Sequence, residues 1–309
     1  MIDGILQIGE FPPLMQRLLD ARLSVTTLAQ LEQDPSLAGT IRGIVTRSNY
    51  AVPAELIDRL PALRIVSTCG VGYDQIPIAH AHARDVVVTH TPDVLNAAVA
   101  ELGVGLLLGL LRKLPAADRH VREGRWPAGT VPLATSLSGK RVGIAGMGRI
   151  GQELAWRLEP FGVELGYYAR HRREALPWHF DPDLTALARW ADILILLLPG
   201  SAQTAGIVDA AVLDALGPEG YLVNIARGVV VDEPALLDAL ENRRIAGAAL
   251  DVFDHEPDID PRFLALDNVV LSPHIGSATR ETRAAMMQLT LDNLEQYLTA
   301  GRALTPVAA

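Results

Sequence analysis

Three side chains with complementary chemistry follow predicted strands in the second half of the sequence: Arg227, Glu256 and His274. An arginine at the carboxyl end of a strand can bind a carboxylate through two parallel hydrogen bonds. A histidine titrates near neutral pH, so it can donate a proton to a developing alkoxide. A glutamate beside it can orient the imidazole and favour its protonated form. Each residue alone also fits an ordinary loop or surface position, but the three together are suited to reducing a carbonyl group.

The stretch at 140–151, K-R-V-G-I-A-G-M-G-R-I-G, predicts where a cofactor binds. An apolar run precedes Gly146, Gly148 and Gly151, and apolar residues at helical spacing follow them. This order of strand, G-x-G-x-x-G turn and helix is typical of sites where a dinucleotide pyrophosphate lies at a helix N-terminus. The alternative is a tight turn with nothing bound. A nicotinamide cofactor would supply the hydride that carbonyl reduction needs.

The residues after the second strand of this region bear on which dinucleotide binds. An acidic residue about 20 positions beyond the glycines usually binds the ribose hydroxyls of NAD. Here that position is Ala169, and Arg170, His171 and Arg172 follow it. Guanidinium groups suit a 2′-phosphate, which a carboxylate would repel. We therefore predict a preference for NADPH over NADH, with a basic surface turn as the alternative.

Alternating strand and helix patterns predict the elements that position these residues. In the first part of the chain, strands are expected at 4–8, 43–46, 65–68 and 86–89, and helices at 13–21, 53–60 and 78–84. In the second part, six strands are expected at 142–145, 164–168, 193–197, 221–225, 247–250 and 269–271, before a last helix at 280–300. Such alternation predicts an α/β fold of doubly wound parallel sheets, which bind ligands at the carboxyl ends of their strands.

Length and composition limit the classes of protein that fit. The 309 residues predict about two domains, and the net charge of −9 argues against a nucleic-acid partner. The single cysteine, Cys69, excludes an internal disulfide framework and a cysteine-based metal site, and we expect no metal. We see no signal peptide and no apolar stretch long enough to span a bilayer, so a cytoplasmic protein without a membrane partner is expected.

Six segments in order resemble the D-2-hydroxyacid dehydrogenase family, and within it the NADPH-dependent glyoxylate/hydroxypyruvate reductases. They are C-G-V-G-Y-D at 69–74, T-P-D-V-L at 91–95, G-K-R-V-G-I-A-G-M-G-R-I-G at 139–151, N-I-A-R-G at 224–228, D-V-F-D-H-E-P at 251–257 and S-P-H-I-G-S-A-T at 272–279. The resemblance implies reduction of a small 2-oxoacid, such as glyoxylate or hydroxypyruvate, to the D-2-hydroxyacid.

The resemblance also implies roles for particular residues. Arg227, Glu256 and His274 are the implied catalytic triad. The backbone N–H groups of Val71 and Gly72 are implied to bind the substrate carboxylate, and Ser277 to touch the substrate. Two glycines after a strand do expose such N–H groups, although an ordinary turn is equally consistent with them. Cofactor contacts are expected at Gly146, Gly148, Arg149, Ile150, Gly151, Arg170, His171, Arg172, Leu198, Pro199, Thr204, Ile225, Ala226, Asp251 (toward the nicotinamide carboxamide) and Gly276.

Two domains with a cleft between them are a further implication of the resemblance. Residues 1–98 with 281–309 would form a flavodoxin-like substrate-binding domain, and 99–280 a dinucleotide-binding Rossmann domain. A homodimer is implied through the long helix predicted from Ala97 to Arg122. That helix is apolar almost all round, so we expect it to be buried, between domains or against a second subunit.

Departures from the family pattern keep other functions open. Of Gly200–Thr204, written G-S-A-Q-T, only the threonine matches the family loop clearly, and no aromatic residue closely follows Trp126. The segment at 132–138 is similar to that of hydroxyphenylpyruvate-type reductases, so bulky 2-oxoacids remain possible substrates. The alternatives are an NAD-linked D-lactate or phenyllactate-type dehydrogenase, which the arginines after Ala169 oppose, and a dinucleotide-sensing binding protein like the C-terminal-binding corepressors. The latter class carries interaction tails, of which none is visible here.

Overall fold

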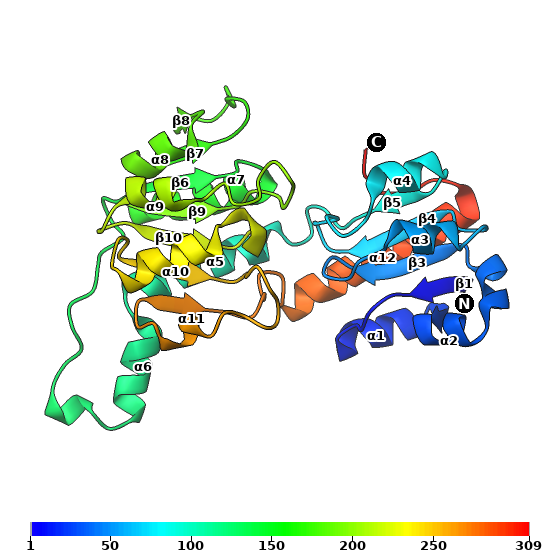
Figure 1. Ribbon diagram of the computed structural model, residues 1–309, viewed down its shortest axis with the longest axis horizontal. Coiled ribbons are helices and arrows are strands. Elements are labelled where there is room, and N and C mark those ends of the chain that lie inside the picture. The colour runs from blue at the N-terminus through cyan, green and yellow to red at the C-terminus, as the bar shows by residue number, and fades with distance from the viewer. Residues whose placement is uncertain (1, 309) are drawn as a thin grey trace. The chain divides into compact units, whose positions relative to one another are not determined.

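The structure is a computed structural model that describes residues 2–308 (Figure 1). The chain divides into two compact units: the chain up to Leu95 joins the chain from Ser277 in a first unit, and Asn96–Gly276 forms a second. Both divisions fall a few residues before the predicted ones. The first does so because helix α5 (Asn96–Leu111) belongs entirely to the second unit. Among the described residues, no helix combines the length and the apolar character needed to cross a membrane.

The first unit contains a five-stranded parallel sheet in the order β2-β1-β3-β4-β5. Its strands are β1 (Ile2–Gln7), β2 (Leu23–Thr27), β3 (Gly43–Arg47), β4 (Ile65–Cys69) and β5 (Val87–Thr89). The chain moves outward from β1 to β2 and then returns to β3 on the other side, which makes the sheet doubly wound. We did not predict β2, because it is an edge strand in which only Leu23 is buried and no apolar run marks it.

Helices lie on both faces of this sheet. They are α1 (Pro13–Asp20), α2 (Leu28–Gln33), the 3₁₀ turn η1 (Pro35–Thr40), α3 (Ala54–Asp58), α4 (Ile78–Ala83) and α12 (Arg280–Ala300). α1 and α12 pack together, and α12 also packs on β3 and β4. The opposite face is closed by a buried cluster that includes Leu31, Leu56 and Ala81, from α2, α3 and α4.

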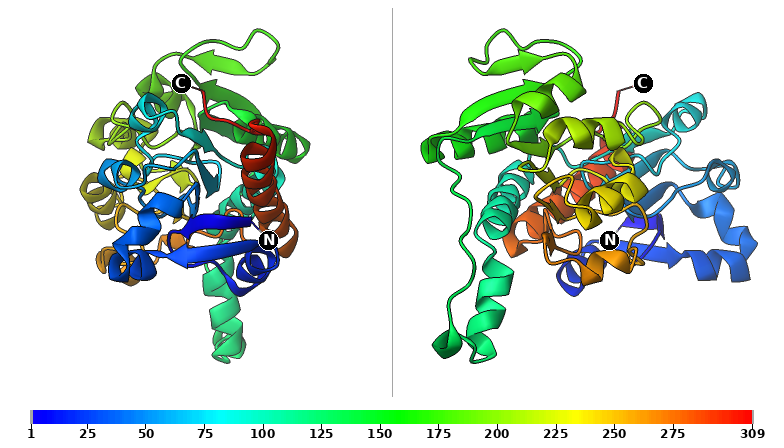
Figure 2. Two further views of the ribbon diagram at one scale, coloured as in Figure 1. Left: turned by 90° about the vertical axis from the view of Figure 1, so that its right-hand side faces the viewer. Right: turned by 60° about the vertical axis from the view of Figure 1, so that its left-hand side comes forward.

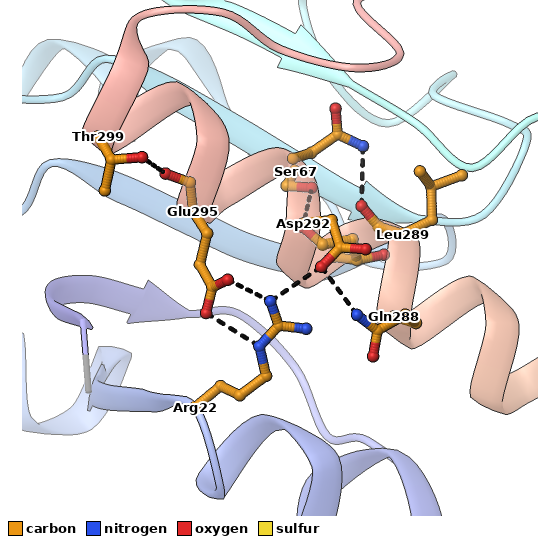
Figure 3. A network of polar contacts seen from close by, with 9 residues as sticks. Arg22, Ser67, Gln288, Leu289, Asp292, Glu295 and Thr299 are labelled. Carbon is orange, nitrogen blue, oxygen red and sulfur yellow. Dashed lines mark hydrogen bonds and ion pairs between the residues drawn. The ribbon is translucent and has the colours of Figure 1, made fainter.

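Polar contacts fix α12 to the rest of the first unit (Figure 3). The Arg22 guanidinium donates to a carboxylate oxygen of Asp292 at 2.8 Å and, through Nε, to Glu295 at 2.9 Å. The buried Ser67 Oγ on β4 donates to the carbonyl oxygen of Thr290 at 3.1 Å. These contacts hold the middle of α12 against β4 and the turn before β2.

The second unit contains a seven-stranded parallel sheet in the order β12-β11-β10-β9-β6-β7-β8. Its strands are β6 (Arg141–Ala145), β7 (Glu164–Tyr168), β8 (His179–Asp181), β9 (Ile193–Leu196), β10 (Tyr221–Asn224), β11 (Gly247–Leu250) and β12 (Val269–Leu271). The expected α/β class with two doubly wound parallel sheets is confirmed. The count of six strands is wrong, because β8 is a three-residue edge strand whose sequence, H-F-D, carries no strand pattern.

Helices and short turns connect these strands. Besides α5 they are α6 (Leu114–Arg122), η2 (Trp126–Ala128), α7 (Arg149–Leu158), η3 (Glu159–Phe161), α8 (Leu184–Trp190), α9 (Ala210–Leu216), η4 (Gly228–Val230), α10 (Glu233–Glu241) and α11 (Arg262–Ala265). α5 packs on α7, and α8, α9 and α10 pack in series. The core between α8–α10 and the sheet is built from aliphatic side chains such as Leu187, Leu213 and Leu237.

The single long helix predicted from Ala97 to Arg122 is wrong, because the chain forms two helices there. Lys113 takes a left-handed conformation with φ of 52° between α5 and α6. Pro115, in the first turn of α6, has no N–H, and inside a continuous helix its ring would clash with the carbonyl group of Leu111. The predicted burial holds for α5 only, since α6 contains no buried residue and extends away from the sheet of its unit (Figure 2).

Candidate active site

The glycine turn after β6 is shaped by close packing on two sides. Gly146 has φ of 108°, and a Cβ atom there would lie 2.6 Å from the carbonyl oxygen of Leu197. A Cβ at Gly151 would lie 2.3 Å from the carbonyl oxygen of Gly146. At Gly148, in contrast, no atom lies within 4 Å of the position of a Cβ. The turn is therefore closed toward the sheet and its helix, and open at Gly148.

The start of α7 fits the pyrophosphate of a dinucleotide. Its N-cap residue is Gly148, which has no side chain to accept a hydrogen bond from the first-turn N–H groups, where Arg149 and Ile150 lie. Those N–H groups and the positive end of the helix dipole face the open side of the turn. A helix N-terminus of this kind is suited to binding a phosphate group.

Basic residues follow β7 at the same edge of the sheet. Ala145 of β6 pairs with Tyr168 of β7, and the Tyr168 carbonyl accepts a hydrogen bond from the Gly146 N–H at 3.0 Å. The next residues, Arg170, His171 and Arg172, all have exposed side chains. The Arg172 guanidinium lies 3.8 Å from the Glu174 carboxylate, which is a loose contact in solvent. This edge therefore presents cationic groups beside the glycine turn.

The loop after β9 is closed by its own threonine. Thr204 Oγ1 donates to the carbonyl oxygen of Pro199 at 2.6 Å and accepts from the Ser201 N–H at 3.0 Å. Leu198 is buried. A Cβ on Gly200 would lie 3.2 Å from Cγ of Arg227, so this loop packs against the arginine side chain.

Arg227 follows β10 in a turn that the buried Asn224 side chain organises. The Asn224 amide donates to the Arg227 carbonyl oxygen at 3.0 Å and accepts from the Ala226 N–H at 3.1 Å. Ile225 and Ala226 are buried. A Cβ at Gly228 would lie 1.8 Å from the backbone carbon of Phe253, so only glycine fits there. We did not single out Gly228, because this contact joins two segments that are distant in the sequence.

Glu256 and His274 form a hydrogen-bonded ion pair. His274 Nδ1 lies 2.6 Å from Glu256 Oε2, and Glu256 Oε1 accepts the Phe253 N–H at 3.0 Å. Burial by itself would raise the pKa of Glu256, but the hydrogen bond and charge of His274, the Phe253 N–H and the Arg227 charge together lower it. The carboxylate is therefore ionised at neutral pH and can only accept. His274 Nδ1 then carries its proton, which leaves Nε2 to exchange a proton with a ligand.

The buried Asp251 carboxylate holds the turn that contains His274. One oxygen accepts from Ser272 Oγ at 2.6 Å and from the Ile275 N–H at 2.9 Å, and the other accepts from the Gly276 N–H at 2.8 Å. His274 has φ of 52°, a left-handed conformation that is unfavourable for a residue with a side chain. The Asp251 carboxylate thus compensates a strained conformation at the proposed proton donor.

The structure brings some of the predicted residues together within one unit and separates others. Arg227, Glu256 and His274 lie at the ends of β10, β11 and β12, with Arg227 close enough for its charge to act on the Glu256 carboxylate. Val71 and Gly72 lie in the first unit, after β4, where the Val71 carbonyl oxygen is 3.0 Å from His90 Nδ1. Ser277 is assigned to the first unit as well.

An apolar pocket of about 280 Å³ adjoins the Glu256–His274 pair. Pro257, Ile259, Leu264 and Leu271 contribute its aliphatic wall. The pocket therefore gives a ligand an apolar surface beside the hydrogen-bonded side chains.

A doubly wound sheet with a dinucleotide-type turn, beside an arginine and a Glu–His pair, defines the class of nicotinamide-dependent oxidoreductases. The chain belongs to the D-isomer specific 2-hydroxyacid dehydrogenase family, whose NAD binding domain matches residues 104–276. The resemblance to this family of NAD(P)-dependent enzymes is thereby confirmed.

Similar proteins span nearly the whole chain. A 2-ketogluconate reductase of Gluconobacter oxydans is 46% identical over 303 residues, which is 98% of each chain. A hydroxyphenylpyruvate reductase of Plectranthus scutellarioides is 42% identical over 308 residues, again 98% of each chain. The crystal structure of an NADPH-dependent glyoxylate/hydroxypyruvate reductase of Sinorhizobium meliloti, in complex with NADP and malonate, has a TM-score of 0.93 and 44% identity, covering 98% of this chain and 96% of that one.

Proposed function

We propose that this enzyme reduces a small 2-oxoacid to the D-2-hydroxyacid with NADPH as the hydride donor. The observation that carries the proposal is the His274–Glu256 hydrogen bond beside Arg227, at the strand ends of a dinucleotide-type sheet. The relatives support it, since they are named as reductases of 2-ketogluconate, hydroxyphenylpyruvate and glyoxylate or hydroxypyruvate. Because the reaction draws on NADPH, we place it in the cytoplasm.

Each side chain has one task in the proposed reaction. The guanidinium of Arg227 binds the substrate carboxylate and polarises the neighbouring carbonyl, and the N–H groups of Val71 and Gly72 bind the same carboxylate. The nicotinamide, when bound, supplies the hydride. His274 Nε2 gives its proton to the oxygen that gains charge, while the Glu256 carboxylate keeps the imidazole oriented and stabilises its charged form. In the oxidative direction neutral His274 takes the proton back.

The exposed arginines after β7 support the preference for NADPH. Arg170→Ala combined with Arg172→Ala should lower kcat/KM for NADPH by about 10- to 100-fold, the range expected when charge-assisted hydrogen bonds to a phosphate are lost. The same variant should leave kcat/KM for NADH within about threefold, because NADH lacks the 2′-phosphate. Steady-state kinetics with both cofactors measures the difference. Arg59→Ala, an exposed arginine of the first unit, is the matched control. Equal kcat/KM values for the two cofactors in the unmodified enzyme would reject the preference.

A panel of 2-oxoacids tests the reaction itself. Glyoxylate, hydroxypyruvate, 2-ketogluconate and hydroxyphenylpyruvate are each assayed with NADPH and with NADH. We expect turnover of at least one substrate, faster with NADPH. Negligible turnover of all four would favour the dinucleotide-sensing alternative, and turnover with NADH alone would favour the NAD-linked dehydrogenase.

The exposed apolar side chains of α6 and the segment after it support a homodimer as part of the proposal. Leu114 is 54% exposed, Val121 53%, Trp126 63% and Leu133 97%. Large apolar groups gathered on one projecting segment are typical of a subunit interface. The molecular mass in solution, measured by sedimentation velocity, decides whether a second copy of this chain covers them.

A further inference from the structure

Two arginines of the first unit lie close together without an acidic partner. Arg47 ends β3, and Arg283 lies in the first turn of α12; both are half-buried. Within residues 2–308, no carboxylate pairs with either side chain. The Arg283 backbone N–H donates to the Thr279 carbonyl oxygen at 3.0 Å, but its guanidinium makes no hydrogen bond there. Arg47 Nη1 donates to the carbonyl oxygen of Glu10 at 2.9 Å, while its buried Nε has no partner. Donors that are buried and unsatisfied in this way are rare in folded proteins.

The electrostatics of this pair are unfavourable as they stand. Burial, and then the charge of Arg47, lower the pKa of Arg283 below the usual arginine value. A cation in the first turn of a helix also opposes the helix dipole. Partly buried like charges are costly unless an anion compensates them. Arg47 is nevertheless held in place, since its guanidinium lies 5.8 Å from the centre of the Tyr50 ring, as a cation–π contact.

The arginine pair borders the turn that we propose binds the substrate carboxylate. β3 and β4 are parallel neighbours, and Arg47 is opposite Cys69, which directly precedes the turn at 70–72. A Cβ at Gly70 would lie 2.6 Å from Oγ of Ser48, the residue after Arg47. Both turns therefore lie at the carboxyl edge of one sheet, which is where α/β sheets bind ligands.

We propose that Arg47 and Arg283 form an oxyanion subsite that binds a second acidic group of the substrate. The subsite would select 2-oxoacids that carry another carboxylate or a phosphate at the end distant from the reacting carbonyl. An oxyanion there neutralises both guanidinium groups and supplies an acceptor for the Arg47 Nε–H. This inference rests on the proposed function, because it concerns the substrate of the same reaction.

Matched substrates test the subsite. The ratio of kcat/KM for 2-oxoglutarate to that for 2-oxovalerate measures the effect of a distal carboxylate on the reaction. The ratio of kcat/KM for 3-phosphohydroxypyruvate to that for hydroxypyruvate measures the effect of a phosphate. Both comparisons use the full-length enzyme with NADPH. Arg283→Gln and, separately, Arg47→Gln should lower at least one ratio by about 10- to 100-fold, with 2-oxovalerate and hydroxypyruvate changing less than about threefold. The ratio that falls in the variants shows whether the subsite binds a carboxylate or a phosphate. Arg283→Lys should restore part of the loss, and Arg59→Gln should have no effect.

A binding measurement separates failure of the subsite from failure of the proposed function. Malonate and inorganic phosphate, added without cofactor, should raise the Tm of the unmodified enzyme and raise it less in Arg283→Gln. If hydroxypyruvate and 2-oxovalerate are reduced but both ratios are equal in all variants, the subsite is rejected and the reaction stands. If no 2-oxoacid is reduced, the proposed reaction is rejected. In that case, an anion that raises the Tm of the unmodified enzyme more than that of Arg283→Gln still supports an oxyanion site at the arginine pair. An equal rise in Tm for the unmodified enzyme and for Arg283→Gln rejects that site.

Discussion

The two units treat buried positive charge in opposite ways. In the second unit, the Arg227 charge acts on Glu256, and Glu256 is hydrogen-bonded to His274. In the first unit, Arg47 lies close enough for its charge to act on Arg283, and within the described residues no acid pairs with either side chain. The first arrangement is complete within the chain, so its geometry exists before any ligand arrives. The second lacks an anion, so we expect its stability and its selectivity to depend on what binds.

A proton donor and a recognition group have different requirements, which explains this contrast. Proton transfer needs atoms placed to within a fraction of an ångström, and the Asp251 carboxylate provides that precision by bonding the backbone around His274. Recognition of an oxyanion needs excess positive charge, which a protein carboxylate nearby would neutralise. The proposed subsite therefore requires that no acid pairs with Arg47, and none does within residues 2–308.

The largest effect is expected from removing the proton donor of the complete arrangement. His274→Ala should lower kcat for 2-oxoacid reduction by about 10²–10⁴-fold, the usual contribution of general acid catalysis. His255→Ala is the matched control, because this neighbouring histidine is exposed and its ring lies 3.7 Å from Asp254 instead of contacting Glu256. The measurement is kcat at saturating substrate for the unmodified enzyme, His274→Ala and His255→Ala. A loss of tenfold or less would mean that water or another group delivers the proton, and the two regions would then differ less than we argue.

A smaller effect is expected on thermal stability, where Glu256 and the arginine pair of Arg47 and Arg283 should behave differently. The pKa of Glu256 is lowered in the folded state, so its pairing stabilises the fold above the unfolded-state pKa of about 4.3 and stops doing so as the pH falls through the folded pKa. Glu256→Gln should lower the Tm at pH 7 by about 1–4 °C, as expected for a partly exposed ion pair. The difference should shrink as the pH falls below about 4.3 and through the folded-state pKa.

Calorimetric or fluorescence melts across that pH range provide the measurement for Glu256→Gln. Asp258→Asn, at an exposed carboxylate nearby, serves as the control. A Tm difference that persists unchanged into acid would show that the pair contributes packing instead of charge. Arg283→Gln should behave differently, with no loss of Tm at pH 7 in buffer free of polyvalent anions, because its removal relieves a repulsion.

The smallest effect concerns the thiol beside the unpaired arginines. Burial raises the pKa of Cys69 to about 11, although a hydrogen bond with Thr290 and the charges of Arg283 and Arg47 act in the opposite direction. A thiol reagent at pH 8 should therefore modify the native protein slowly and the urea-unfolded protein at once. The time course of labelling at this single cysteine gives the result. Rapid labelling of the native protein would indicate that the region around the arginine pair opens to solvent.

Much of this organisation is predictable from the sequence because it depends on local pattern. Buried parallel strands such as β9 and β11 are continuous apolar runs, and Arg227, Glu256 and His274 each follow a predicted strand within a few residues. Edge strands escape the same reasoning: β2 buries a single residue and β8 none. Pro115 indicates the break before α6, because proline is disfavoured inside a helix, whereas the apolar pattern around it continues across the break.

Features that depend on contacts between distant segments were not predictable in this way. Gly228 appears in the sequence as one glycine among 26, and only the fold shows it pressed against the Phe253 backbone. Asp251 is an aspartate after a strand, and only the structure shows three hydrogen bonds that hold the His274 turn. Arg47 and Arg283 are near opposite ends of the chain, so no local pattern relates them.

The placement of α12 has a consequence for the way the protein is made. β4 is synthesised early, but the helix that covers it, with the Thr290 carbonyl that its Ser67 requires, is translated only after the second unit. While the ribosome adds the whole of Asn96–Gly276, one face of the first sheet stays uncovered, whereas the second unit can fold as soon as it emerges. The nascent chain thus completes its middle before its beginning, and chaperones have the longest opportunity to act on the first sheet.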